Sequence, residues 1–494
     1  MKHKIFIKNA AILTATSLIL RTVGIFFRIW LSGAVGAEGM GLYQLVISVY
    51  AFASTFATCG ICTAVTRLVS ENANYQKSVL RRAIFLSLII SVITFLPLFF
   101  FSDFIAVNVV YDIRLSLSIK VLCFSLPFMA ISSCLRGFFI AKRNTLAPSV
   151  GQLSEQAVRI IVIMLLVEKL SVYGLQYSTA AILIGDAVAE AAGTLVLFIT
   201  YLASSKKSTK VSGNKGCGYR AILHIATPIT AGRYIHTFLR TIENILVPLR
   251  LSVFVSNKSV SLEQYGMLKG MAMPILFFPA SFLMAFSTLM IPEISEALIK
   301  NQMLRVKTAV EKSIGITIIA STAIGGIFLL LGVPIAKLLY SSRDTGVLIC
   351  ALSPLVPFMY LESVCDGILK GLDQQTHSFI YSVIDSASRI VLIYFAVSRF
   401  GMVGFILIMM YSNILTSTLN IKRLLKVTKT PFKVGSWLLK PLFSITLGLF
   451  VGYFAKAQVT GDLLSIITGG GVLLVVYVLS MFFMGELKII DGVF

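Results

Sequence analysis

Two arginines interrupt the first apolar run of the sequence, LILRTVGIFFRIW, at positions 21 and 28. Arg21 and Arg28 are seven residues apart, nearly two helical turns, so in a helix they share one face and lie about 10 Å apart along the axis. The planar guanidinium donates paired, charge-assisted hydrogen bonds to phosphate oxygens and stays protonated. The spacing therefore predicts a face that binds a ligand about as long as a diphosphate with its first sugar.

Depth in the membrane separates the two arginines. A charge at the bilayer centre costs about 2.5 to 3.5 kcal/mol on insertion scales, so it indicates a ligand or an ion-pair partner. Arg28 lies near the end of the run, where a long side chain reaches the interface, so Arg21 is the stronger candidate. Arg240 and Lys269 complete the predicted diphosphate-binding set. The competing interpretations are an ion pair with Glu243 or Glu190 for Arg240, and snorkelling to the interface for Lys269.

The composition is that of an all-α integral membrane protein. Of the 494 residues, 57% are hydrophobic and 13% are charged, with a mean hydropathy of +0.90, whereas soluble domains are about 25% charged. The net charge of +22 comes from basic clusters between apolar runs, such as SSKKSTKVSGNK at 204–215. This pattern indicates membrane topology and gives no reason to expect a nucleic-acid partner.

Gly, Pro and charged residues divide the chain into about fourteen segments of the length that a membrane span needs. The basic clusters favour a multi-pass protein of the bacterial cytoplasmic membrane with both termini in the cytoplasm. The expected spans are 5–31, 40–69, 81–101, 115–141, 147–168, 176–203, 220–250, 265–298, 309–331, 346–370, 377–398, 402–421, 434–456 and 463–484.

The two halves of the chain resemble each other. Residues 132–161 align with 362–391 at a constant offset of 230, which corresponds to six spans, so both halves face the same way. We expect two parallel-repeat six-helix lobes around a central cavity, at 1–218 and 219–430, and two extra C-terminal spans at 431–494.

The remaining charges suggest ties, a gate and a cation site. Glu155 with Arg159 and Asp385 with Arg389 are four residues apart, a spacing at which each pair neutralises itself on one helix. Arg136 aligns with Asp366, which suggests a charge pair between the lobes that gates transport, with a plain interhelical tie as the alternative. Asp186 and Glu190 form a further gating or coupling pair, which either relays protons or pairs with the arginines. A cation site is expected at Glu243, Asn244 and Asp385.

The sequence lacks the motifs of an enzyme or an ATP-driven pump. No loop exceeds about 17 residues, which leaves no room for a soluble catalytic domain, and no phosphate-binding Walker loop is present. The histidines lack zinc-binding spacing, and one isolated Cys-x-x-Cys at 59–62 has no second pair. We expect no catalytic residue, metal or cofactor, with Na⁺, H⁺ or the membrane potential as the energy source.

The pattern Arg21-x-x-Gly24-x-x-x-Arg28, followed by GAEGMGLYQ at 36–44, resembles the opening of stage V sporulation protein B and related polysaccharide-biosynthesis membrane proteins. These belong to the multidrug, oligosaccharidyl-lipid and polysaccharide exporter superfamily, together with MurJ-like lipid II flippases. The resemblance implies a flippase that moves a polyprenyl-diphosphate-linked oligosaccharide, such as a peptidoglycan precursor, from the inner to the outer leaflet by alternating access. MurJ-like proteins also carry a cation in span 2, where this chain reads SVYAFASTFATCG.

Three other functions compete with this interpretation. A cation-coupled multidrug antiporter of the same superfamily would favour acids in the first span, but none precedes Glu38. A membrane glycosyltransferase usually needs a large outer loop, and the outer loops here are short. The third is a scaffold in cell-wall assembly. The expected partners are therefore the lipid-linked sugar, the bilayer and, for the scaffold, cell-wall synthesis proteins.

Overall fold

The structure is a computed structural model that describes residues 2–58, 60–71, 75–205 and 218–486. Every regular element in these residues is helical, which confirms the all-α prediction. Packing divides the chain into two units, Met1–Leu249 and Arg250–Phe494. The boundary lies inside a helix, 31 residues beyond the predicted lobe boundary at 218, and the division into 1–218, 219–430 and 431–494 stays a prediction. Residues 206–217, most of the basic stretch used for orientation, lie outside the described residues.

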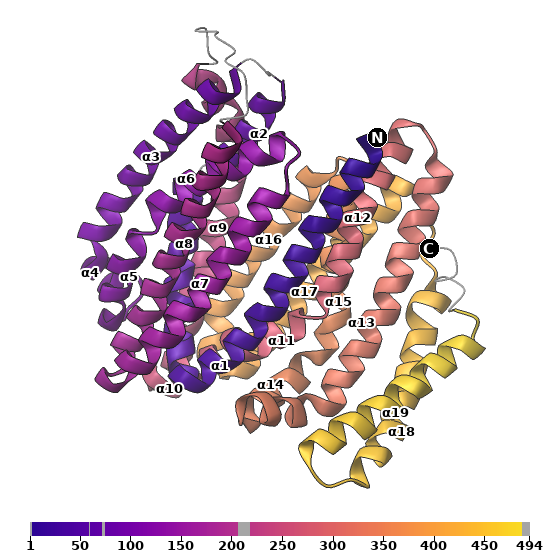
Figure 1. The fold of residues 1–494 in the computed structure, drawn as a ribbon. Helices are drawn as coiled ribbons and strands as arrows, with labels where there is room; N and C mark the ends of the chain where they lie inside the picture. The colour runs from indigo at the N-terminus through magenta and orange to yellow at the C-terminus, as the bar shows by residue number, and fades with distance from the viewer. Residues whose placement is uncertain (1, 59, 72–74, 206–217, 487–494) are drawn as a thin grey trace. The chain divides into compact units, whose positions relative to one another are not determined.

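In its described residues, the first unit has eight helices and most of a ninth, with short 3₁₀ and π segments between them (Figure 1). Its elements are α1 Lys2–Thr58, α2 Ile61–Glu71, α3 Gln76–Phe100, α4 Ser102–Phe104, η2 Ile105–Val109, η3 Ile113–Leu115, α5 Ser116–Cys123, α6 Leu126–Ala141, α7 Leu146–Leu170, η4 Ser171–Tyr173, α8 Leu175–Ser205 and α9 Tyr219–Val255.

The second unit begins near the end of α9 and contains the remaining helices. They are α10 Lys258–Gly266, η5 Met267–Ala272, α11 Met273–Phe277, α12 Ala280–Ile299, α13 Met303–Tyr340, α14 Arg343–Leu352, η6 Ser353–Leu355, α15 Val356–Gly371, α16 Gln375–Leu392, η7 Ile393–Val397, α17 Ser398–Thr428, η8 Gly435–Leu439, α18 Lys440–Ala457 and α19 Asp462–Phe483.

The described residues contain nine helical stretches long and apolar enough to cross a membrane. The number is ten if Ile113–Cys123 and Leu126–Ala141, which meet at a 44° bend, form one span. Ala11–Glu71 and Gln375–Thr428 have 61 and 54 residues, more than twice the length that one span needs. Each of the fourteen predicted ranges lies mostly on helix, but the number fourteen is not confirmed.

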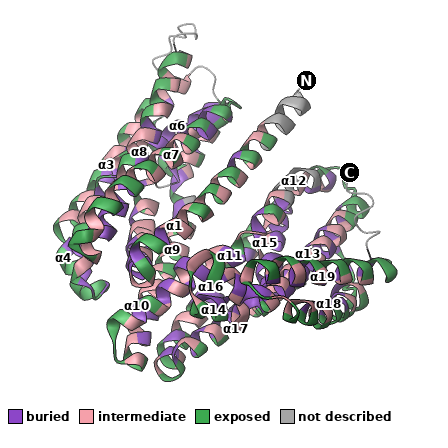
Figure 2. Cartoon of the chain, turned by 60° about the horizontal axis from the view of Figure 1, so that its bottom comes forward, coloured by how far each residue is buried: buried purple, intermediate pink, exposed green. Residues whose placement is uncertain are grey.

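The outer surface of the helices is apolar, as contact with lipid requires. On α3, Phe85, Ile89, Ile93 and Phe100 are exposed at near-helical spacing, and Phe100 is 72% exposed. Figure 2 shows exposed residues along α3 and α19. In a soluble protein such a surface would promote aggregation, whereas in a bilayer it contacts the hydrocarbon chains of the lipids.

Helix α1 is two helices joined at Gly36. Gly36 has φ 72° and ψ 177°, a conformation that glycine adopts readily because it has no Cβ. The chain turns there, so that α1 consists of a first arm before Gly36 and a second arm after it (Figure 1). Both arms belong to the first unit and α1 packs with α7 and α8, so the turn brings residues far apart in the sequence of α1 to one place.

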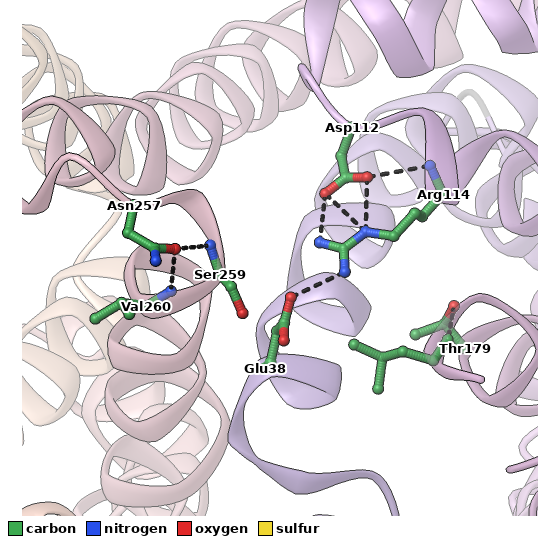
Figure 3. A network of polar contacts seen from close by, with 8 residues as sticks. Glu38, Asp112, Arg114, Thr179, Asn257, Ser259 and Val260 are labelled. Carbon is green, nitrogen blue, oxygen red and sulfur yellow. Dashed lines mark hydrogen bonds and ion pairs between the residues drawn. The ribbon is translucent and has the colours of Figure 1, made fainter.

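An ion cluster lies beside this turn. The Arg114 guanidinium donates from Nη1 to Glu38 Oε1 at 2.9 Å and from Nη2 to Asp112 Oδ2 at 2.8 Å. Figure 3 shows Arg114 between the two carboxylates. Because Glu38 follows Gly36 by two residues, the cluster links the start of the second arm to the segment before α5. Sequence reasoning quoted Glu38 but did not find Arg114 as its partner.

The C-terminal helices α18 and α19 form a pair that packs on α13. Lys456 Nζ on α18 donates to the Leu330 carbonyl of α13 at 2.8 Å, and Tyr477 on α19 donates to the Ile319 carbonyl at 3.0 Å. Ala323, Ile445 and Leu473 belong to the apolar cluster between these helices. The two extra helices predicted from the sequence are therefore tied to the second unit.

Candidate functional site

A cavity of about 350 Å³ lies within the first unit, between the two arms of α1 and the helices α7 and α8. Each helix presents residues three or four positions apart, the spacing that places side chains on one helical face. The lining residues are Gly24, Phe27, Arg28 and Leu31 from the first arm, Tyr43, Ile47 and Tyr50 from the second arm, Gln156 and Arg159 from α7, and Asp186 and Glu190 from α8.

Glu155 joins three helices behind the cavity wall. Its Oε2 lies 2.9 Å from Arg136 Nη2 on α6, and its Oε1 lies 2.8 Å from Arg159 Nη2 one turn along α7. Gly193 on α8 packs against it, since a Cβ on Gly193 would lie 3.0 Å from the Glu155 Cβ. The four-residue tie between Glu155 and Arg159 that we predicted is thus confirmed.

Arg159 has partners on each side of its guanidinium. Besides Glu155, it donates to Gln156 Oε1 at 2.9 Å, and its Nε lies 2.8 Å from Asp186 Oδ1 on α8. The Tyr43 hydroxyl on the second arm of α1 also interacts with Asp186. Buried charges are tolerated when paired and hydrogen-bonded, so Arg159 and Asp186 form a neutral part of the cavity wall.

Arg28 differs from Arg159 in the same cavity. Within the part of the chain that the structure describes, no residue forms a hydrogen bond or an ion pair with Arg28, although its charge acts on Tyr43. Its N–H groups are therefore available to a ligand. Because a guanidinium binds planar or phosphate oxygens with paired hydrogen bonds, Arg28 gives the cavity an anion-binding group.

Glu190 is the second group with unused hydrogen-bonding capacity. It is 8% exposed, and its Oε2 has no hydrogen-bond partner among the described residues. It lies one turn beyond Asp186 on α8 and lines the same cavity. A buried acceptor without a donor is unfavourable, so this oxygen requires a donor from a ligand or from water.

The cavity brings together some of the predicted residues and leaves others outside. Arg28, Asp186 and Glu190 line it, but Arg21, which we ranked above Arg28, is exposed on the first arm and is not part of the lining. Arg240 is exposed on α9. Lys269 belongs to the second unit, in η5, with its Nζ 5.9 Å from the Phe405 ring centre. The predicted diphosphate-binding set stays a prediction beyond Arg28.

The proposed gate residues have ion-pair partners within their own units. Arg136 pairs with Glu155, as described, and Asp366 pairs with Lys370 at 2.6 Å and accepts a hydrogen bond from Ser378 on α16. The interhelical tie that we considered as the alternative accounts for Arg136. For Asp366 the ion pair lies within one helix, and Ser378 links it to the next.

The tentative cation-site residues lie on elements of different units. Glu243 is buried on α9 with Asn244 beside it, and Asp385 is buried on α16 with Arg389 Nε 3.2 Å from its Oδ2. The predicted four-residue tie on α16 is thus confirmed. Among the described residues, no three His, Cys, Asp or Glu side chains gather as metal ligands would, and the cation site stays a prediction.

Sequence reasoning missed the uncharged polar residues of the cavity. Tyr43 and Tyr50 lie on the second arm, and Gln156 lies next to Glu155. The Tyr50 hydroxyl accepts a hydrogen bond from Ser125 at 2.8 Å. The available signal was the spacing of Tyr43, Ile47 and Tyr50 on one helical face, but an apolar run gives little contrast by which to select such residues.

A family profile of polysaccharide biosynthesis proteins matches residues 6–298. The match covers more than half of the 494 residues, and it includes the whole cavity. The chain therefore belongs to the polysaccharide biosynthesis protein family, the family that the residues from 21 to 44 resemble.

Particular relatives extend the likeness over most of the chain. Stage V sporulation protein B of Bacillus subtilis is 25% identical over 454 residues, covering 89% of this chain and 87% of that protein. The structure of lipid II flippase MurJ in an inward closed conformation matches with a TM-score of 0.73 at 17% identity, over 97% of this chain and 100% of that one. An inward-facing MATE multidrug resistance transporter of the MOP superfamily matches with a TM-score of 0.62 at 15% identity, over 85% and 100%. The chain is thus a multi-pass membrane protein with the fold shared by these transporters.

Proposed function

We propose that this protein is a flippase that moves a polyprenyl-diphosphate-linked sugar from the inner to the outer leaflet of the bacterial cytoplasmic membrane, with both chain termini in the cytoplasm. The observation that carries the proposal is Arg28, a cation in the wall of a 350 Å³ cavity with its hydrogen bonds unused among the described residues. The likeness to a lipid II flippase supports the same reaction class.

The residues divide into a binding group and a fixed wall. Arg28 binds the diphosphate, and Arg159, held by Glu155 and Asp186, keeps α7 and α8 in register. Arg21, Arg240 and Lys269 are further diphosphate contacts that the sequence suggests. The protein makes and breaks no covalent bond in this reaction, so binding and release of the charged head group are the steps that its side chains must control.

Exchange of a fluorescent polyprenyl-diphosphate sugar between the leaflets of proteoliposomes tests the proposal. Arg28→Ala removes a charge-assisted interaction of about 1.5 to 3 kcal/mol, so exchange should slow about tenfold or more. Arg67→Ala is the matched control, because Arg67 is 65% exposed and pairs with Glu71 on the surface; it should exchange at the wild-type rate. Equal rates for Arg28→Ala and wild type would contradict the role of Arg28, and no exchange by wild type would contradict the function.

A cation-coupled multidrug antiporter is a second candidate. Asp186 and Glu190 line the same cavity, and the fold is also that of a MATE transporter. Asp186 is already paired with Arg159, which leaves Glu190 as the acid for such a role. Uptake of a lipophilic cation into the same proteoliposomes under an imposed Na⁺ or H⁺ gradient, in the absence of any lipid-linked sugar, would favour this candidate over the flippase.

A further inference from the structure

Glu190 and Arg28 line one cavity from different helices, and each has hydrogen-bonding capacity that the described residues do not use. Arg28 offers donors, whereas the Glu190 carboxylate offers only acceptor oxygens when ionised. A ligand that satisfies both must therefore carry acceptors at one end and donors at the other. A bare diphosphate has oxygen acceptors alone and would be repelled by Glu190.

We propose that Glu190 forms a subsite for the first sugar of the lipid-linked substrate and accepts hydrogen bonds from its hydroxyl or amide groups while Arg28 binds the adjacent diphosphate. This inference rests on the proposed function and adds Glu190 as the group that recognises the sugar. Sugar hydroxyls and N-acetyl N–H groups are neutral donors, which a buried carboxylate oxygen can accept without a further charge entering the cavity.

The other lining residues suit a sugar. Tyr43, Tyr50 and Phe27 give the cavity aromatic walls, and Gln156 adds an amide on α7. Small-ligand sites are typically 300 to 1,000 Å³ with aromatic walls and a few polar groups that fix orientation, so a volume of 350 Å³ suits a head group of small-molecule size. The sugar ring can then pack on an aromatic side chain while its polar edge faces Glu190.

A cation is a less suitable occupant of this place. Arg28, whose charge no described residue pairs, lines the same cavity, and like charges within a few ångströms repel each other strongly in a poorly solvated site. The described residues also offer no group of three metal-ligating side chains here. A neutral hydrogen-bond donor avoids this repulsion, which is why the carboxylate favours a sugar over an ion.

The experiment compares two lipids on each protein in detergent: farnesyl diphosphate, and farnesyl diphosphate carrying one N-acetylglucosamine. Wild type should bind the glycosylated lipid about tenfold more tightly than the bare diphosphate. Glu190→Gln preserves the shape but removes the charge, and the preference should fall to about twofold or less. Glu190→Asp keeps the charge on a shorter side chain and should retain an intermediate preference. Glu168→Gln, an exposed position on α7, is the matched control and should bind both lipids as wild type does.

The outcomes separate this inference from the proposed function. If Glu190→Gln melts at the wild-type temperature and keeps the tenfold preference, the sugar subsite is wrong while diphosphate binding stands. If wild type binds neither lipid, the proposed function itself fails. A third outcome would overturn the inference: wild type binds Na⁺ or tetraphenylphosphonium, Glu190→Gln does not bind it, and wild type binds the two lipids equally. Glu190 would then be a cation site.

Discussion

The Arg159 Nε on α7 lies 2.8 Å from the Asp186 Oδ1 on α8, so an ion pair closes one side of the cavity. Both residues also take part in a wider network through Glu155 and Tyr43. The pair therefore fixes two adjacent helices at the depth where Arg28 faces them. Its strength can be tested separately from transport.

Asp186→Asn should lower the free energy of unfolding by about 3 kcal/mol, because it leaves the Arg159 charge largely buried with one partner fewer. Chemical unfolding in detergent micelles measures the change. Glu71→Gln, which breaks the exposed pair with Arg67, should change stability by less than about 1 kcal/mol. Equal effects of the two substitutions would show that the Arg159–Asp186 pair contributes no more than a surface pair.

Gly36→Ala should destabilise the protein by about 1 to 3 kcal/mol, because a residue with a Cβ is strained at φ 72° and ψ 177°. No atom lies within 4 Å of the added Cβ, so the effect comes from the backbone alone. Gly33→Ala is a matched control in the helical part of the first arm, with equally open surroundings, and should be neutral or stabilising by up to about 1 kcal/mol. A neutral Gly36→Ala would contradict the turn.

Lys142, which follows α6, should react faster with amine reagents near neutral pH than an ordinary lysine does. Partial burial, and then the charge of Lys77, lower the pKa of Lys142, so more of its amine is neutral at a given pH. Lys77→Ala should raise this pKa and slow the labelling of Lys142, as mass spectrometry against pH can measure. Lys169→Ala, at the other end of α7, should leave the labelling profile of Lys142 unchanged.

Under the proposed function, membrane potential should drive the lipid-linked substrate towards the outer leaflet. Moving one negative charge to the positive side of the membrane lowers its free energy by about 2.3 kcal/mol per 100 mV. For an uncompensated diphosphate with two charges, the free energy falls by about 4.6 kcal/mol at 100 mV. Proteoliposomes with a potassium diffusion potential should accumulate the labelled lipid in the positive leaflet, and reversing the potential should reverse the accumulation. Accumulation that is unchanged after both the potential and the ion gradients collapse would exclude this energy source.

The helical membrane fold was predictable because composition and apolar run length dominate it. The ties of Arg159 and Arg389 to acids four residues away were predictable for a similar reason, since helical spacing determines them. The number of spans was less accessible, because a turn at one glycine such as Gly36 makes one run of helix out of two predicted segments.

The choice between Arg21 and Arg28 required the packing. Seven-residue spacing places both arginines on one face of α1, but it does not tell which of the two lies opposite α7 and α8. Arg28 does so. The alignment of Arg136 with Asp366 suggested a gate, yet Arg136 pairs with Glu155 and Asp366 pairs with Lys370, each within its own unit. Such local pairs are favoured because a shorter segment of chain must be ordered to bring the partners together.

The width of the cavity depends on the φ and ψ angles of Gly36, because these angles set the direction of the first arm relative to the second. The first arm carries Arg28, the second arm carries Tyr43, and both line the same cavity. Arg28 is eight residues from Gly36, about 12 Å along the helix, so a rotation of about 10° at the turn moves the Arg28 backbone by about 2 Å. A displacement of this size is enough to bring the Arg28 guanidinium into or out of hydrogen-bonding range of a phosphate. The ion-paired wall of α7 and α8 need not change.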